Sequence, residues 1–264
     1  GRFHGGDNST PHPMGQPSAY ERFYRESISS PDAFWAEQAK AIEWRTPFGQ
    51  VCDFSRPPFV KWFVGGRTNL CHNAVDRHLA TRAEQPAIHF FSSETGEERT
   101  LTYRQLHREV NRMAAVLRAL GVGRGDGVVV YLPMIPEAAV AMLACVRIGA
   151  IHSTVFAGFA APSLATRIDD AEARVVITCD AGMRAGKVVP LKNIADEAMS
   201  RQPTIEACIV VRRTGQEIYM EPGRDYWYHD LMSLPISSPM CYTEQMDAED
   251  PLFILYTSGT TGRP

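Results

Sequence analysis

Apolar and polar residues follow one another along most of the chain in two rhythms, which predict different elements. Short runs of mostly β-branched and other apolar residues, each the length of one buried strand, occur at residues 127–133, 150–158, 173–180, 207–213 and 252–256. Stretches with helical spacing lie among them at residues 102–121, 135–149, 162–173 and 191–201. This alternation predicts an α/β fold with mostly parallel, doubly wound sheets and helices on both faces.

The chain before residue 104 has a different pattern. Residues 29–44 predict a helix with Ser30 as cap and Pro31 in its first turn, and residues 69–82 predict a second one. Between them, residues 51–66 are expected to form an irregular connector, because Pro57 and Pro58 exclude a helix there. Residues 86–103 predict a hairpin, and the first 17 residues a loose tail.

Composition narrows the function classes. A formal net charge of -3 gives no global basic field of the kind that nucleic-acid binding needs. No apolar run reaches the length of a membrane span. The six cysteines lie far apart with no CxxC pair, which indicates a reducing compartment and neither structural zinc nor a disulfide framework. The expected location is the cytoplasm, or the mitochondrial matrix if a presequence has been removed.

The candidate chemistry lies in the stretch "LYTSGTTGRP", residues 255–264, which leaves the carboxyl end of a predicted strand. Hydroxyl groups and glycines at this density can surround phosphate oxygens with O–H and backbone N–H donors. A hydroxyl-rich surface turn explains the same composition equally well. The stretch is not a Walker loop, because Gly259 and Gly262 are too close and no Gly-Lys-Ser/Thr follows.

Other polar residues are expected to be structural. His152 lies in an apolar strand and is interpreted as a core histidine, and His72 and His78 lack metal-ligand spacing. Asp169 and Asp170 are expected to be solvated or paired with Arg167. Trp62 and Phe63 are expected in a core or an interface.

Several of these stretches resemble one known family. "YTSGTTGRP" resembles the phosphate-binding signature of the AMP-forming acyl-CoA synthetases, an adenylating family. Residues 62–79, 97–159 and 167–178 are similar to its short-chain branch, the acetyl- and propionyl-CoA synthetases, with "GRTNLCHNAVDRHL" at 66–79 closer to the propionate enzymes. Two residues depart from the pattern: Ala157 replaces a common glycine, and Lys187 stands where acetyl-CoA synthetases often have arginine.

The resemblance implies a ligase that activates a short-chain carboxylate, with propionate favoured and acetate as the alternative. MgATP converts the carboxylate to an acyl-adenylate, and CoA then takes the acyl group and releases AMP. ATP, Mg²⁺ and CoA are substrates or activators, with no tightly bound cofactor and no protein-held metal. The expected partners are small molecules, with no nucleic acid and no membrane. The rivals are a peptide-synthetase adenylation domain and a non-catalytic nucleotide-binding fragment.

The resemblance also implies two binding sites. The ATP phosphates would contact the signature loop, at Thr257, Ser258, Gly259, Thr260, Thr261 and Gly262. The 3′-phosphate of CoA would bind the "RAGK" loop, at Arg184, Ala185, Gly186 and Lys187. In the family the acyl pocket and the catalytic lysine follow the phosphate loop, so no catalytic residue is expected in this chain, which alone should be inactive. Residues 1–67 would be a tail and helical extension, and residues 68–264 the first part of the large N-terminal domain.

Overall fold

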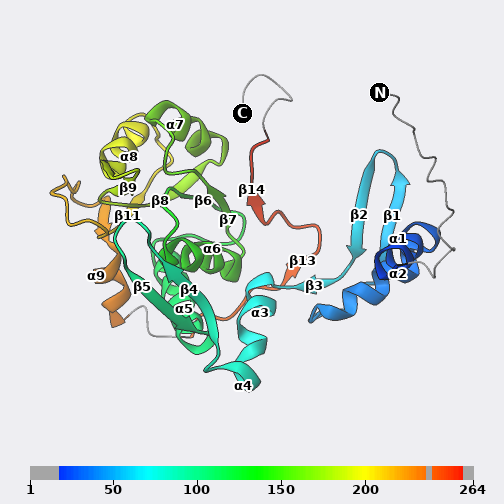
Figure 1. Cartoon of the computed structure of the whole chain (residues 1–264). Coiled ribbons are helices and arrows are strands. Elements are labelled where there is room, and N and C mark those ends of the chain that lie inside the picture. Colours follow the sequence, from blue (N-terminus) through cyan, green and yellow to red (C-terminus); the bar gives the residue numbers. More distant parts are fainter. Residues whose placement is uncertain (1–17, 236–239, 258–264) are drawn as a thin grey trace, which may run out of the picture.

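A six-stranded, fully parallel sheet forms the centre of the molecule (Figure 1). The computed structural model describes residues 18–235 and 240–257. In spatial order the strands are β12 (Asp225–Trp227), β11 (Ala207–Val211), β8 (Ala173–Cys179), β6 (Gly127–Val130), β7 (Ile151–Thr154) and β14 (Phe253–Ile254). The predicted α/β class and parallel sheet are confirmed, whereas β12 was not predicted.

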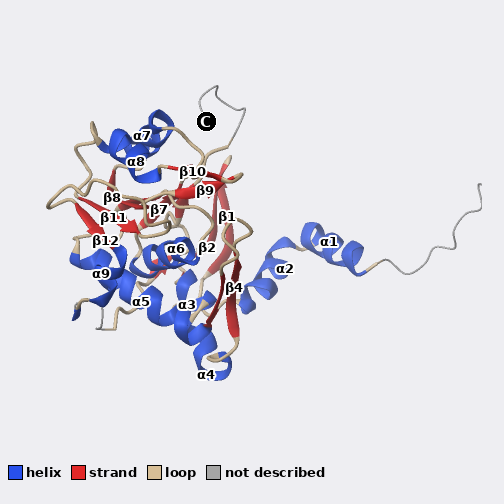
Figure 2. Ribbon diagram, turned by 60° about the vertical axis from the view of Figure 1, so that its left-hand side comes forward, coloured by secondary structure: helices blue, strands red, loops and turns tan. Residues whose placement is uncertain are grey.

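Helices cover both faces of this sheet (Figure 2). One layer holds α5 (Tyr103–Ala119), α6 (Pro136–Ile148) and α9 (Tyr228–Ser233), and the other holds α7 (Ala161–Asp170) and α8 (Leu191–Met199). The chain moves one way across the sheet from β6 to β7 and the opposite way from β7 to β8 and β11. Because such crossovers are right-handed, the reversal places α6 and α7 on opposite faces.

Local sequence explains where the longer helices begin and end. Thr102 and Gln105 form the predicted capping box of α5, with each side chain accepting a hydrogen bond from the other residue's backbone N–H. Helix α6 has Pro136 at its first position and ends at Gly149, whose φ of 75° is left-handed. Between the layers, Val128–Val130 of β6 and the apolar residues of β8 and β11 are buried.

The segment expected to be an irregular connector is instead a β-hairpin, so that prediction was wrong. β1 (Gln50–Arg56) pairs antiparallel with β2 (Phe59–Val64), and Pro57 and Pro58 occupy the turn. The prolines exclude a helix as expected, but in a turn their missing N–H groups cost no ladder hydrogen bond. Before this hairpin, the predicted helix at 29–44 is shorter than expected: α2 spans Pro31–Gln38 and a 3-10 turn follows at Ala39–Ala41.

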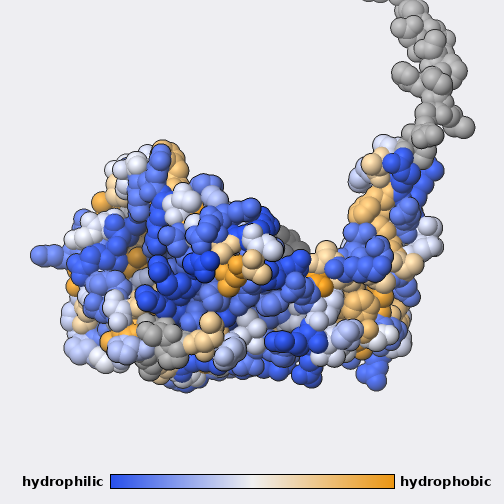
Figure 3. Space-filling model, turned by 90° about the horizontal axis from the view of Figure 1, so that it is seen from below, coloured by the Kyte–Doolittle hydropathy of each residue, from blue (hydrophilic) through white to orange (hydrophobic). Residues whose placement is uncertain are grey.

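An additional helix, α1 (Ala19–Ser29), precedes α2 and was not predicted. Together α1 and α2 project from the body (Figure 2). Apolar side chains gather along this projection, in the orange band at the right of Figure 3. Phe23 and Ile28 of α1 are exposed. In the described ranges, 18–235 and 240–257, no helix is long and apolar enough to cross a membrane.

Short elements connect the projection to the body. The helix predicted at 69–82 is divided into α3 (Leu70–Ala74), a 3-10 turn (Asp76–His78) and α4 (Leu79–Arg82). The predicted hairpin is confirmed as β4 (Pro86–Phe91) and β5 (Glu98–Thr102). A two-residue ladder joins β3 (Arg67–Thr68) to β13 (Met246–Asp247), which brings residues 246–247 beside residues 67–68.

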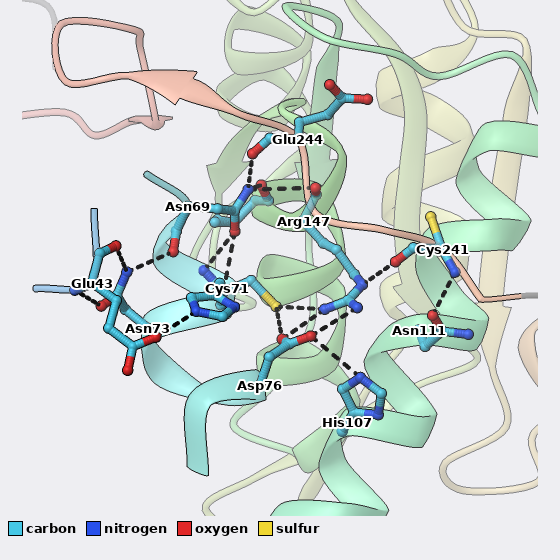
Figure 4. Close-up of polar contacts among 12 residues, drawn as sticks. Glu43, Asn69, Cys71, Asn73, Asp76, His107, Asn111, Arg147, Cys241 and Glu244 are labelled. Carbon is cyan, nitrogen blue, oxygen red and sulfur yellow. Dashed lines mark hydrogen bonds and ion pairs between the residues drawn. The ribbon is translucent and has the colours of Figure 1, made fainter. Parts of the chain in front are cut away.

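A buried polar network holds α3 against α6 (Figure 4). The Arg147 guanidinium, on a side chain only 2% exposed, donates to both carboxylate oxygens of Asp76 at 2.8 and 3.0 Å and to the carbonyl of Cys241. Asn69 caps α3 and donates to the carbonyl of Val146 at 2.9 Å. Burial alone would raise the pKa of Asp76, but hydrogen bonds from His107 and Arg147 outweigh it and hold that pKa well below the usual range.

Candidate functional site

A cavity of about 580 Å³ opens at the carboxyl ends of the central strands. Its lining includes residues 132–135 after β6, 154–158 at the end of β7, and Leu255 after β14. The turn of the β4–β5 hairpin closes another side, at residues 90–94. In open parallel sheets ligands bind where the strand order reverses, outside the carboxyl ends. The reversal here lies between β6 and β8, so the cavity has that position.

The predicted "RAGK" loop is the turn of a short β-hairpin at this cavity. β9 (Gly182–Arg184) pairs antiparallel with β10 (Lys187–Val189), and the register sets Arg184 directly opposite Lys187. Ala185 and Gly186 form the two-residue turn with positive φ values of 49° and 72°, as a type I′ turn requires. Opposed residues of a hairpin project from the same face, which brings the two cationic side chains close together.

A carboxylate from another hairpin fixes the turn. Glu94, in the β4–β5 turn, accepts hydrogen bonds from the backbone N–H groups of Ala185 at 3.1 Å and Gly186 at 3.2 Å. These two hydrogen bonds join residues that are separated by 91 and 92 positions in the sequence. Glu94 therefore fixes the turn that joins Arg184, which lines the cavity, to Lys187 on the opposite strand.

Arg184 lines the cavity and lies over an aromatic ring. Its guanidinium carbon is 5.2 Å from the centre of the Phe156 ring, within the range of a cation–π interaction. Gly158 permits this arrangement, because a Cβ there would be 2.5 Å from an Arg184 terminal nitrogen and 2.4 Å from the Phe156 ring. Any larger residue at position 158 would therefore require the Arg184 guanidinium or the Phe156 ring to move.

The cationic groups around the cavity differ in their partners. Arg213 also lines it, but forms an ion pair with Glu97 and donates to Ser92. Among the described residues, neither Arg184 nor Lys187 has a carboxylate within 4 Å. Like charges directly opposite on a hairpin are unfavourable by themselves, and a bound anion would relieve that repulsion. The site is therefore suited to a phosphate-bearing ligand.

A buried carboxylate holds together the loops that follow β8 and β11. Asp180 follows β8 and is only 1% exposed. Its oxygens accept backbone N–H donors from Ala181, Arg213, Thr214 and Gly215 at 2.6–3.1 Å. This pattern fixes the ends of β8 and β11 relative to each other and supports Arg213 at the cavity wall.

The hydroxyl-rich motif, residues 257–262, begins beside the same cavity. Leu255 is part of the lining, and Thr257, the first residue of the motif, is exposed two residues further on. Residues 258–262, which complete the predicted ATP site, lie outside the described residues. The two sequence-predicted sites therefore approach each other at one edge of the sheet, and only the first residue of the ATP site is described.

The residues interpreted as structural have structural surroundings. His152 is buried and stacks on Phe253 at 5.7 Å, and burial lowers its pKa to about 4. His72 contacts Glu43 at 2.7 Å, and the described part of the chain holds no group of side chains suited to a metal ion. Trp62 packs on Trp35, and burial raises the pKa of the Cys145 thiol to about 12. Asp170 bonds not Arg167 but the hydroxyl of Tyr256, at 2.8 Å.

Comparison with known proteins identifies the family. The pattern of the AMP-binding enzyme family matches residues 75–264, and that of the acetyl-coenzyme A synthetase N-terminus matches residues 20–74. The chain belongs to the AMP-binding enzyme family. The predicted resemblance to adenylating acyl-CoA synthetases is supported, whereas nothing in these matches supports the propionate branch over the acetate branch.

Individual relatives cover nearly the whole chain. An acetyl-coenzyme A synthetase of Desulfatibacillum aliphaticivorans is 51% identical over 247 residues, and one of Methylorubrum extorquens is 52% identical over 250. Each match covers 93% of this chain and 38% of the relative. The solved structure of acetoacetyl-CoA synthetase from Streptomyces lividans matches with a TM-score of 0.85 at 32% identity, over 94% of this chain and 38% of that one. The chain thus spans well under half the length of these AMP-binding enzymes.

Three residues at the cavity were missed by sequence reasoning. Phe156 and Gly158 lie in a predicted strand whose end turns toward the cavity, and the glycine there was the available signal. Glu94 is one of several acidic residues in a hairpin turn. Its partner lies 91 residues away, so no local pattern could have selected it.

Proposed function

We propose that the protein carrying this chain is an AMP-forming ligase that activates a short-chain carboxylate with MgATP and transfers the acyl group to CoA. The observation that carries the proposal is Arg184 at the wall of the switch-point cavity, with Lys187 directly opposite it in the β9–β10 hairpin. In this proposal they bind the 3′-phosphate of CoA. Thr257, Ser258, Gly259, Thr260, Thr261 and Gly262 bind the phosphates of ATP, as donors and not as nucleophiles.

The chemistry follows from these roles. In the first half-reaction a carboxylate oxygen attacks the α-phosphorus of MgATP, and pyrophosphate leaves. In the second, the CoA thiol attacks the carbonyl carbon of the acyl-adenylate, and AMP leaves. The residues of this chain hold phosphates in place and neutralise their charge, which lowers the entropic and electrostatic cost of both steps.

Acetate is the carboxylate that the names of the relatives indicate. Relatives at 47–52% identity are named acetyl-coenzyme A synthetases. The propionate preference came from residues 66–79, whose described contacts serve the buried network around Asn69 and Asp76 and do not line the cavity. We therefore propose acetate as the substrate and keep propionate as the competing outcome.

Product formation in the intact protein tests this function. With MgATP and CoA, acetate should yield acetyl-CoA and AMP in equal amounts, at a specificity constant about tenfold or more above that for propionate, since one methylene is worth about 1–3 kcal/mol in a fitted pocket. A higher constant for propionate would reverse the substrate assignment. If no short-chain acid yields AMP, the ligase function is contradicted, and the protein would bind nucleotide without ligase activity.

We further propose that residues 68–264 are the first part of the large domain and that the 264-residue chain is inactive by itself. The chain covers 38% of the length of each of the two acetyl-coenzyme A synthetases compared above. Incubation of the chain with acetate, MgATP and labelled pyrophosphate should give no label in ATP above background. Exchange at the rate of the intact protein would place the complete adenylation site within residues 1–264.

A further inference from the structure

Arg167 of α7 lies between two aromatic rings in the interior. The residue is only 5% exposed, and its guanidinium carbon is 4.5 Å from the centre of the Phe159 ring and 4.4 Å from that of Tyr256. One terminal nitrogen donates to the carbonyl of Ser163 at 2.9 Å. In the described ranges no carboxylate lies within 4 Å of this guanidinium. The two rings are therefore the main partners of a buried charge.

One of the two rings is held independently of Arg167. The hydroxyl of Tyr131, at the end of β6, donates to the carbonyl of Phe159 at 2.7 Å. The Phe159 ring also meets Phe156 edge-on, with centres 5.8 Å apart. Because Phe159 is fixed by these contacts, the guanidinium stacked on it provides a fixed surface for the second ring.

The second ring belongs to the residue before the hydroxyl-rich motif. Strand β14 ends at Ile254, so the ladder with β7 does not extend to Tyr256. Two side chains of α7 hold Tyr256 instead. Arg167 stacks on its ring, and Asp170 accepts its hydroxyl hydrogen at 2.8 Å. Burial, with the Asp170 contact, raises the pKa of Tyr256 to about 12, so the hydroxyl stays protonated as a donor.

We propose that Arg167 is a positioning residue for adenylation, which acts through Tyr256 to set the position of Thr257. This proposal rests on the proposed function, since it assigns Arg167 to the ATP half-reaction. A helix-stabilising role alone would not explain the arrangement, because Leu164 and Ile168 already bury the apolar face of α7. The planar guanidinium fills the space between two rings as neither a carboxylate nor an ammonium could.

The test is ATP–pyrophosphate exchange by the intact protein in the absence of CoA. Arg167→Met keeps the length and apolar stem of the side chain and removes the charge. We expect the KM for ATP to rise about tenfold, equivalent to about 1.4 kcal/mol. Arg167→Lys should fall between this variant and wild type, and Tyr256→Phe, which keeps the ring and loses the Asp170 contact, should raise the KM about threefold. The KM for CoA in the complete reaction should stay within about threefold.

A matched control and a second measurement separate positioning from stability. Arg104→Met makes the same change at an exposed residue paired with Glu84 and should leave every constant unchanged. Thermal unfolding gives the Tm of each variant. If Arg167→Met lowers Tm and kcat while its KM for ATP stays within twofold of wild type, Arg167 is structural and the proposal is overturned. If Arg167→Met does not fold, Arg167→Lys and Tyr256→Phe decide in the same way.

The outcome also distinguishes this proposal from the proposed function. If wild type catalyses exchange and Arg167→Met has the same KM for ATP, only the proposed role of Arg167 is contradicted. Wild type that neither catalyses exchange nor binds MgATP in calorimetry contradicts the ligase function, and the role of Arg167 with it.

Discussion

At the scale of single residues, the candidate CoA site depends on contacts that orient Arg184. The Glu94 carboxylate holds the turn beside it, the Phe156 ring lies under its guanidinium, and Gly158 leaves room for both. None of these three residues has to contact a phosphate in order to affect its binding. Each can be tested by its effect on CoA without altering the cationic groups.

Replacement of Glu94 tests the contact between the two hairpins. In Glu94→Gln one oxygen is replaced by an NH₂ group, so the side chain can no longer accept from both Ala185 and Gly186. In the intact protein we expect the KM for CoA to rise about three- to tenfold, with pyrophosphate exchange within twofold. Glu98→Gln removes the same charge from an exposed position on the same hairpin and should change neither value. If the two variants raised the KM for CoA equally, the cause would be the lost net charge and not the contact between Glu94 and the turn.

Gly158 tests the close approach of the β7 loop to Arg184. In Gly158→Ala the added methyl group would overlap an Arg184 nitrogen and the Phe156 ring, so one or both must move. We expect the KM for CoA to rise about tenfold, while ATP–pyrophosphate exchange is retained. Gly49→Ala, where no atom lies within 4 Å of the added Cβ, is the control. Unchanged CoA kinetics in Gly158→Ala would show that the position of Arg184 does not matter for CoA.

At the scale of elements, the Arg147–Asp76 pair joins α6 to the segment after α3. Arg147 is almost fully buried, and removal of the carboxylate leaves its charge without an ionic partner. The groups that face Asp76 are Arg147, His107 and Cys71. Because the folded-state pKa of Asp76 is lowered, its stabilisation is complete above the ordinary carboxyl pKa and is lost as the pH falls below it.

Asp76→Asn should therefore destabilise the protein in a pH-dependent way. At neutral pH we expect a loss of about 3 kcal/mol in the free energy of unfolding, seen as a Tm lower by about 6 °C or more. Between about pH 5 and pH 3 the Tm difference from wild type should begin to shrink, since wild type loses part of the Asp76 contribution there and the rest only at lower pH. A difference that is constant over this range would mean that Asp76 does not titrate with a lowered pKa.

The sequence predicted the elements of the central sheet better than those around it. Buried strands such as β6 and β8, and the capped helix α5, were identified because pattern and caps agree locally. The β1–β2 hairpin was missed because Pro57 and Pro58 indicated only what could not form. Helices α1 and α9 and strand β12 are short or exposed, and short elements carry weak periodic signals.

At the scale of the whole molecule, the strand order brings Leu255, two residues before Thr257, to the same cavity as Arg184. Arg184 and Lys187 were predicted as flanks of a loop, but their direct opposition in a hairpin and the place of Arg184 in a cavity wall were not predicted. Contacts such as Glu94 with Ala185, or Arg167 with Tyr256, join residues about 90 positions apart. Such pairs depend on topology, so neither propensity nor a short motif could have predicted them.

The central claim is that the cavity beside the β9–β10 hairpin binds the 3′-phosphate of CoA. Its most direct test is the KM of the intact protein for CoA and for dephospho-CoA, which lacks that phosphate, in wild type and Arg184→Ala. Loss of one charge-assisted hydrogen bond, worth about 1.5–3 kcal/mol, should raise the KM for CoA about ten- to hundredfold, with pyrophosphate exchange within twofold. Wild type should discriminate against dephospho-CoA, and Arg184→Ala should scarcely do so. If the variant still discriminates as wild type does, Arg184 is a solvated surface charge and the phosphate binds elsewhere.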